Sequence, residues 1–265
     1  TWHDHGNDSG KPMVWLDGLD VPLVAMFNAG FAESGESDKQ NVTLPQGTAD
    51  ARYGSGLLPV DWKPTRQTSP IFNYPYARTR EALRGLVKAG PPDACHGSNQ
   101  RYVNPASGSA PIATMGPFMQ LLPRGFETAP YRSTDGTVFS VVEGEGESVI
   151  GEKIFRWKPR DHFVVPSWAQ VSHKAGTEAV LFSFSDRPVQ ERLDLGREDR
   201  ARRQLRPDCS LAHPPLLRRD RACALVGWQG AQMSVVCVDE LGPPARTVAA
   251  VERDEQRAGI GLEAH

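Results

Sequence analysis

Five short segments between residues 111 and 186 constrain the fold of this 265-residue chain more than any other feature. Each is rich in β-branched and aromatic residues, and glycine, proline or aspartate separates it from the next. They read IATMGPFMQLL, GTVFSVVEGEG, KIFRW, DHFVVPSW and AVLFSFSD. Short strands with a turn at each end are typical of a β-sandwich or β-barrel. We therefore predict an all-β domain over residues 111–192.

The sequence before this domain has two different characters. Residues 12–26, PMVWLDGLDVPLVAM, are apolar with Asp17-Gly18 in the middle, which predicts a β-hairpin. Residues 33–110 are rich in turn-forming residues and predict a connecting segment. Within it, apolar residues recur at helical spacing over residues 76–90, so we expect one amphipathic helix there.

The last part of the chain, residues 193–265, predicts no packed domain. Between residues 175 and 265 there are thirteen arginines and no lysine, and hydrophobic periodicity is poor. An arginine-rich helix that binds nucleic acid is conceivable, but the interspersed acidic residues favour a solvated or disordered tail. The change to arginine alone also raises the hypothesis of translation in a shifted frame.

Composition excludes several classes of protein. The net charge of −2 gives no reason to expect a nucleic-acid partner, and no run of eighteen apolar residues predicts a membrane span. The four cysteines have no CxxC spacing, which indicates free thiols in a reducing, cytoplasmic compartment rather than a disulfide pair.

The first residues carry a motif. His3-Asp4-His5-Gly6-Asn7 contains H-x3-N, the end of the second conserved motif of cupin barrels. Both cupin motifs also fit the spacing of the predicted all-β domain, over residues 125–144 and 160–175. Their four metal-ligand positions there are occupied by Tyr131, Ser133, Thr137 and Val171. These side chains are poor ligands for Fe(II), so we predict that this barrel is metal-free. His173 follows two residues later and has no partner at ligand spacing.

Several longer phrases resemble one family. WHDHGND, VWLDGLDVPLV, FNYPYARTREAL, GPFMQLLPRGFETAPYRSTDGTVFSVVEG and PRDHFVVPSW are similar to gentisate 1,2-dioxygenase and to the salicylate and 1-hydroxy-2-naphthoate dioxygenases. The resemblance covers residues 1 to about 192. It implies a bicupin fold, two double-stranded β-helix barrels joined by a short helical connector. Residues 1–32 would be the end of an incomplete first barrel, and we expect its beginning to lie upstream of Thr1.

The resemblance also implies roles for three residues. His3 matches the third histidine ligand of the family's iron, whereas the separate H-x-H pair that supplies the other two ligands in that family has no match in this chain. His5 matches a histidine close to the substrate, and Asp17 an acidic residue of the site's surroundings. The residues themselves leave alternatives open: a solvent-facing His3, a structural hydrogen bond for His5, and closure of the Asp17-Gly18 turn.

The implied activity is that of an Fe(II)-dependent dioxygenase. Three neutral imidazoles would leave one face of the metal open for a small aromatic hydroxy acid and dioxygen. The ring would be cleaved between its carboxyl-bearing and hydroxyl-bearing carbons, so that gentisate gives maleylpyruvate. The alternative is a non-catalytic, metal-free cupin remnant that only folds or oligomerises. In either case we expect a homo-oligomer.

Overall fold

The computed structural model describes residues 7, 10–12, 15–31, 33, 41–63, 67–71, 73–200 and 235–238, of which Trp15 and residues 235–238 are described by their backbone alone. The chain divides into two compact units. One comprises Thr1–Asp4 with Gly18–Val235, and the other His5–Asp17 with Val236–His265. None of the described helices is long and apolar enough to cross a membrane.

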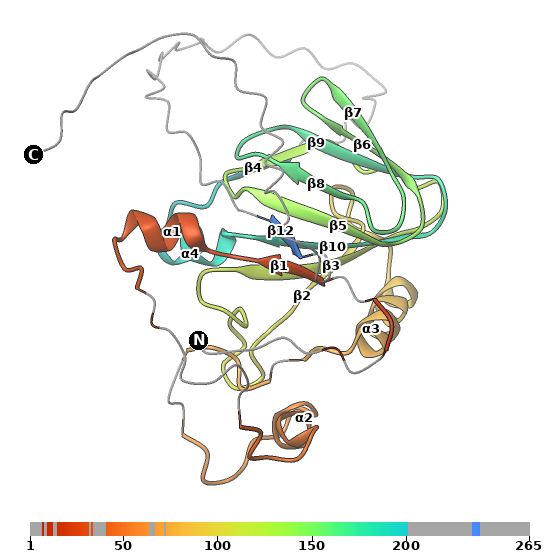
Figure 1. The fold of residues 1–265 in the computed structure, drawn as a ribbon. Helices are drawn as coiled ribbons and strands as arrows, with labels where there is room; N and C mark the ends of the chain where they lie inside the picture. The colour runs from red at the N-terminus through yellow and green to blue at the C-terminus, as the bar shows by residue number, and fades with distance from the viewer. Residues whose placement is uncertain are drawn as a thin grey trace, which may run out of the picture. The chain divides into compact units, whose positions relative to one another are not determined.

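Two five-stranded antiparallel sheets form the main body of the first unit (Figure 1). One sheet has the order β2-β3-β10-β5-β8, and the other has the order β11-β4-β9-β6-β7. The strands are β2 (Ser98–Arg101), β3 (Gly116–Leu122), β4 (Tyr131–Ser133), β5 (Thr137–Glu143), β6 (Gly146–Ile150), β7 (Lys153–Trp157), β8 (His162–Val165), β9 (Val171–Ala175), β10 (Ala179–Ser185) and β11 (Glu198–Arg200). The described fold is thus mostly β, as predicted from the short apolar segments.

Turn chemistry sets the strand pairing. β6 and β7 form a hairpin in which Ile150 pairs with Lys153, so only Gly151 and Glu152 make the turn. Gly151 has φ of 58°, a left-handed conformation that glycine adopts without steric strain. Two-residue hairpin loops require such positive φ values because the loop must match the twist of the strands.

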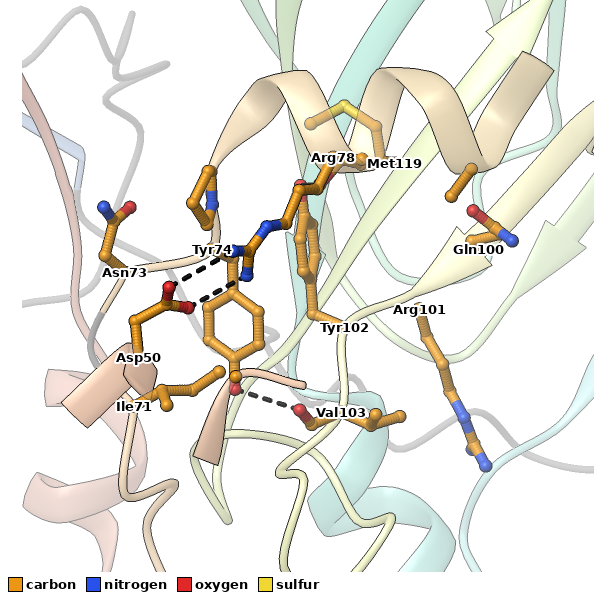
Figure 2. Close-up of a pocket in the computed structure, with 14 residues that line it drawn as sticks. Asp50, Ile71, Asn73, Tyr74, Arg78, Gln100, Arg101, Tyr102, Val103 and Met119 are labelled. Carbon is orange, nitrogen blue, oxygen red and sulfur yellow. Dashed lines mark hydrogen bonds and ion pairs between the residues drawn. The ribbon is translucent and has the colours of Figure 1, made fainter. Parts of the chain in front are cut away.

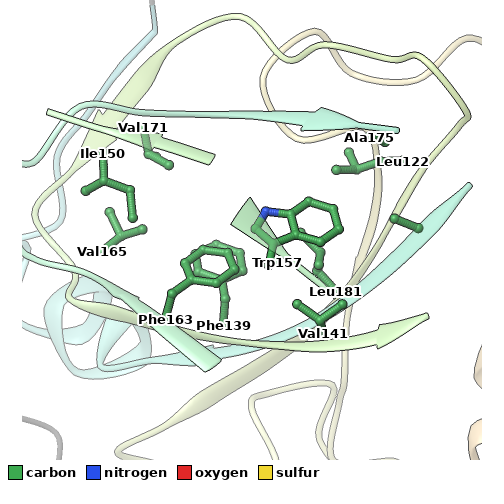
Figure 3. Packing of buried hydrophobic residues seen from close by; sticks show 11 residues of the cluster. Leu122, Phe139, Val141, Ile150, Trp157, Phe163, Val165, Val171, Ala175 and Leu181 are labelled. Carbon is green, nitrogen blue, oxygen red and sulfur yellow. The ribbon is translucent and has the colours of Figure 1, made fainter. Parts of the chain in front are cut away.

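The space between the two sheets is filled by apolar side chains (Figure 3). The rings of Phe139 and Phe163 stack with centroids 5.0 Å apart, and Trp157 is 4% exposed. The other buried members of this interior cluster are Leu122, Val141, Ile150, Val165, Val171, Ala175, Ala179 and Leu181. The interior cluster is therefore a packed core.

The amphipathic helix expected over residues 76–90 is α3 (Tyr76–Ala89), which covers the outer face of the first sheet. Leu83 is completely buried and packs with Met119, Leu121 and Val180 in a second, smaller cluster. We call this the outer cluster. Tyr76, Tyr102, Val142 and Phe182 pack against it.

The expected hairpin over residues 12–26 is wrong. The structure has one strand there, β1 (Trp15–Gly18), followed by helix α1 (Val21–Met26); β1 pairs with β12 (Val235–Val238). Gly18 lies where a Cβ atom would come within 2.9 Å of the Phe184 ring, so close approach accounts for this glycine. Pro22 lies in the first turn of α1, a position where its missing N–H costs nothing.

The ordered structure extends beyond the predicted boundaries. The segment 33–110 contains a second helix, α2 (Thr48–Tyr53), and also the edge strand β2. After β10 come α4 (Arg187–Arg192) and β11, and β11 lies in the predicted tail. The rest of that tail, residues 201–234 and 239–265, lies outside the described residues.

Candidate functional site

Of the three residues singled out from the sequence, only Asp17 lies in the described part of the chain. His3 and His5 lie outside the described residues. Asp17 is the third residue of β1 and is partly buried. Its place in a strand excludes the turn-closing role that the Asp-Gly pair suggested, whereas a role near a substrate stays a prediction.

The four positions that match metal ligands in the cupin motifs have other partners. Tyr131 packs against the interior cluster and edge to face against His96, with ring centroids 4.4 Å apart. Burial raises the pKa of the Tyr131 phenol, which keeps it protonated. The hydroxyl of Ser133 donates to Asp135, and Val171 is a core residue that is 1% exposed. Within the described residues, no group of three His, Cys, Asp or Glu side chains could hold a metal ion.

His173 is a buried polar residue of β9. It is 1% exposed, and its ring lies 5.1 Å from that of Phe139. Its Nδ1 lies 2.7 Å from the hydroxyl of Ser148, which also accepts a hydrogen bond from Nε1 of Trp157 at 2.9 Å. Burial lowers the pKa of His173 to about 3, so the imidazole is neutral at neutral pH.

The two ring nitrogens of His173 have different surroundings. Nδ1 and the hydroxyl of Ser148 share one hydrogen bond, in which either atom can be the donor. Nε2 is buried and has no hydrogen-bond partner among the described residues. A neutral imidazole that lies against the stacked rings of Phe139 and Phe163 is a structural core residue, and it belongs to no group of three candidate metal ligands among the described residues.

A charged network joins β11 to the rest of the barrel. Arg187 donates to Asp135 at 3.1 Å and to Glu198 at 3.2 Å, and Glu198 also lies 3.3 Å from Nε2 of His96. The hydrogen bond from His96 is the largest cause that lowers the pKa of Glu198 to about 2. Burial alone would raise the pKa of Asp135, but the nearby Arg187 holds it below its ordinary value. These are structural ion pairs. No sequence motif predicts them, because their partners lie far apart in the chain.

Residues 143–147, EGEGE, include a carboxylate with a structural role that the sequence does not reveal. Glu143, the first of these residues, accepts a hydrogen bond from Nε of Arg80 at 3.0 Å and another from the hydroxyl of Tyr76. Arg80 also pairs with Glu178. The guanidinium, on α3, thus bridges two carboxylates of the barrel at the rim of the outer cluster.

A cavity of about 430 Å³ opens between α3, β2 and the segment before α3 (Figure 2). The rings of Tyr74 and Tyr102 meet edge to face with centroids 5.2 Å apart. Arg78 makes a bidentate ion pair with Asp50, at 3.0 Å for Nη1–Oδ1 and 3.2 Å for Nη2–Oδ2. The cavity is also lined by Gly54, Ile71, Asn73, Pro75, Thr79, Ala82, Gln100, Arg101, Val103 and Met119.

The tyrosines of this cavity are held in place by hydrogen bonds. The hydroxyl of Tyr74 donates to the carbonyl of Val103 at 2.9 Å, and that of Tyr102 donates to Oγ1 of Thr79 at 3.1 Å. Burial raises the pKa of both phenols. The cavity therefore has neutral aromatic walls and one charged pair at its edge. We call it the outer cavity; its lining comes from segments far apart in the chain, so no local pattern in the sequence marks the cavity.

Comparison with known proteins gives the chain a clear set of relatives. No protein-family model matches it. It is 55% identical over 200 residues to gentisate 1,2 dioxygenase 1 of Aquipseudomonas alcaligenes. The matched residues make up 76% of this chain and 58% of that protein. It is 37% identical over 207 residues to gentisate 1,2-dioxygenase of Streptomyces sp, again 76% of this chain and 58% of that protein.

A solved structure of salicylate 1,2-dioxygenase from Pseudoaminobacter salicylatoxidans, an adduct with gentisate, matches with a TM-score of 0.63 and 31% identity. The match covers 68% of this chain and 51% of that one. The chain thus spans somewhat more than half the length of these relatives, and its described strands have the cupin arrangement of the solved enzyme.

Proposed function

Because this chain is a homologue of the gentisate 1,2-dioxygenases, we propose that it forms part of an enzyme that opens the ring of gentisate or a related hydroxybenzoate. Dioxygen is the second substrate. Cleavage falls between the carboxyl-bearing and hydroxyl-bearing ring carbons, and gentisate gives maleylpyruvate. The identity of 55% over 200 residues to a named gentisate dioxygenase is the observation that carries this proposal.

The metal of this proposal is Fe(II), with His3 as one of its ligands. The described residues do not fit Fe(II), because the ligand positions of their barrel hold Tyr131, Ser133, Thr137 and Val171, each occupied in packing or in a hydrogen bond to a neighbour. A single histidine outside that barrel does not complete a site. The remaining ligands of the proposed site must therefore come from residues other than those described.

The described barrel then serves as a structural partner of the catalytic one. Its interior is filled by Phe139, Phe163 and Trp157, so it has no room for a substrate ring. His5 is proposed to lie near the substrate and to exchange a proton with it, since imidazole titrates near neutral pH. Asp17 is proposed to orient a neighbouring group through a hydrogen bond.

The test compares this chain with the protein encoded by its whole reading frame. Both are supplied with Fe(II) and gentisate anaerobically, then exposed to air, and ring opening is followed by the absorbance of the product. We expect turnover and stoichiometric iron for the longer protein, and loss of both on His3→Ala. Lys11→Ala, a change in the same stretch, is the matched control. A longer protein that lacks an upstream H-x-H pair, or His3→Ala with full iron content, would overturn the proposal.

The second candidate function is a metal-free cupin that folds or oligomerises without catalysis. It is favoured by one observation, the lack of a metal-holding group among the described residues. In the same assay it predicts that the 265-residue chain binds no stoichiometric iron and opens no ring. Tight iron binding and turnover by this chain alone would exclude it. The homo-oligomer expected in either case is measured by light scattering.

A further inference from the structure

The outer cavity has the dimensions and the lining of a site for a small ring. Its volume of about 430 Å³ falls within the range of roughly 300–1,000 Å³ that is usual for small-molecule sites. Met119 and Ile71, which are 5% and 8% exposed, supply apolar surface, and the rings of Tyr74 and Tyr102 stand at 72° to one another. A flat ring inserted there gains one stacked and one edge-to-face contact.

The charged group at its edge already holds a carboxylate. The two terminal nitrogens of Arg78 donate hydrogen bonds to the two carboxylate oxygens of Asp50. This planar bidentate geometry is the one by which arginine binds carboxylates in general. Both side chains are exposed, 57% for Arg78 and 40% for Asp50. Such a surface pair contributes only about 0–1 kcal/mol, so exchange of one carboxylate for another costs little.

A second arginine favours an anionic ligand. Arg101 lines the same cavity and is in no ion pair among the described residues. Without Asp50, the lining residues include two arginines and no aspartate or glutamate. A neutral ring would leave this charge uncompensated, whereas an aromatic carboxylate supplies the ring and the anion in one molecule.

We propose that the outer cavity binds a small aromatic monocarboxylate. The ring of this ligand lies against Tyr74 and Tyr102, and its carboxylate takes the place of Asp50 on Arg78. Asp50 belongs to α2, so occupation of the cavity releases the contact that ties α2 to α3. The outer cavity uses none of the residues proposed for ring cleavage, and it is a second binding site on the chain.

The experiment is calorimetric titration of the 265-residue chain with benzoate in the presence of a metal chelator. Benzoate has no ring hydroxyl and the metal is removed, so binding is independent of the proposed ring-opening reaction. We expect saturable binding of benzoate and about tenfold weaker binding of benzamide, which has the same shape without the charge. Acetate, which has the charge without the ring, should bind more weakly still.

Three variants locate the site. Arg78→Gln should weaken benzoate binding about tenfold, because a charged hydrogen-bonded pair is lost. Arg84→Gln, an exposed arginine further along α3 that does not line the cavity, is the matched control and should leave affinity unchanged. Asp50→Asn should tighten binding about two- to fivefold, since the competing carboxylate is removed.

Four results would overturn the proposal: no saturable binding of benzoate, equal binding of benzamide, equal loss in the Arg78 and Arg84 variants, or weaker binding by Asp50→Asn. Amide hydrogen exchange over residues 47–54 gives a further readout. It should become faster when benzoate saturates the site, and unchanged exchange would contradict the release of α2.

Discussion

The sheet that contains β10 has two faces, and they are built differently. Leu181 and Ala179 belong to the interior cluster, and the neutral His173 lies against the phenylalanine rings of that cluster. Val180 and Phe182, which alternate with them, face the outer cluster under α3. That cluster is smaller, is rimmed by the Arg80 ion pairs, and lies beside the open outer cavity.

The difference assigns stability to one face and binding to the other. The interior cluster is closed and apolar, so its side chains hold the barrel together and offer no group to a ligand. The outer face combines aromatic walls, unburied charge and empty volume, which are the features of a binding surface. In this barrel the space between the sheets is filled by the interior cluster, and the outer cavity lies on the other face of the sheet, beside α3.

The largest effect should come from Trp157→Ala in the interior cluster. The change leaves a large cavity and removes the hydrogen bond to Ser148, so we expect a loss of about 3–5 kcal/mol in the free energy of unfolding. Denaturant titration measures it. Ile154→Ala, on the same strand but 63% exposed, is the control. Similar losses for the two variants would mean that the interior is not the main source of stability.

A smaller loss is expected for Leu83→Ala in the outer cluster. Leu83 is fully buried, but the outer cluster has fewer buried members, so the surroundings can relax into the space; we expect about 2–3 kcal/mol. The same titration applies, with the half-exposed Val87→Ala on α3 as the control. A loss greater than that of Trp157→Ala would reverse the ranking of the two faces.

The buried histidine of the interior cluster predicts how the stability of the chain depends on pH. The pKa of His173 is about 3 in the folded chain and 6.5 when unperturbed, so between these values the unfolded chain binds a proton that the folded chain does not. Stability therefore falls as pH decreases through this range, by up to about 1.4 kcal/mol per pH unit.

His173→Asn, whose side-chain oxygen can replace Nδ1, should remove this contribution. Urea titrations at several pH values give the free energy of unfolding as a function of pH, and its slope is compared between wild type and variant. His162→Asn, an exposed histidine of β8, is the control. Parallel slopes for wild type and His173→Asn would contradict the burial of a neutral imidazole.

The smallest effect is expected at the edge of the outer cavity. Asp50→Asn removes an exposed ion pair, so the free energy of unfolding, measured by thermal and denaturant titration, should change by no more than about 0.5 kcal/mol. A loss above about 1.5 kcal/mol would show that the pair is part of the fold and cannot give way to a ligand.

Local patterns in the sequence predicted the strands and the helix that are marked by the spacing of apolar residues along the chain. The alternating apolar segments of residues 111–186 form strands, and the 3.6-residue periodicity of residues 76–90 forms α3. The expected hairpin over residues 12–26 failed because Asp17-Gly18 is also compatible with an extended strand. The close approach of Phe184 to Gly18, which accounts for that glycine, is a tertiary contact.

Contacts between residues far apart in the chain could not be predicted, because no local pattern in the sequence marks them. Arg80 and Glu143 are 63 residues apart, and Arg78 and Asp50 are 28 apart, so neither pair has a spacing signature. The sequence did not predict β2, because its residues SNQR include no apolar side chain and its pairing with β3 is a backbone pairing. The roles of His3 and His5 came from resemblance alone and stay predictions.

The position of β10 has a consequence for how this protein can change over generations. β10 pairs with β3 on one side and with β5 on the other, and its residues supply both clusters in alternation. Inserting or deleting a single codon within it would move the side chains that follow the change to the opposite face of the sheet. A point substitution alters one cluster, whereas such a change in length alters both.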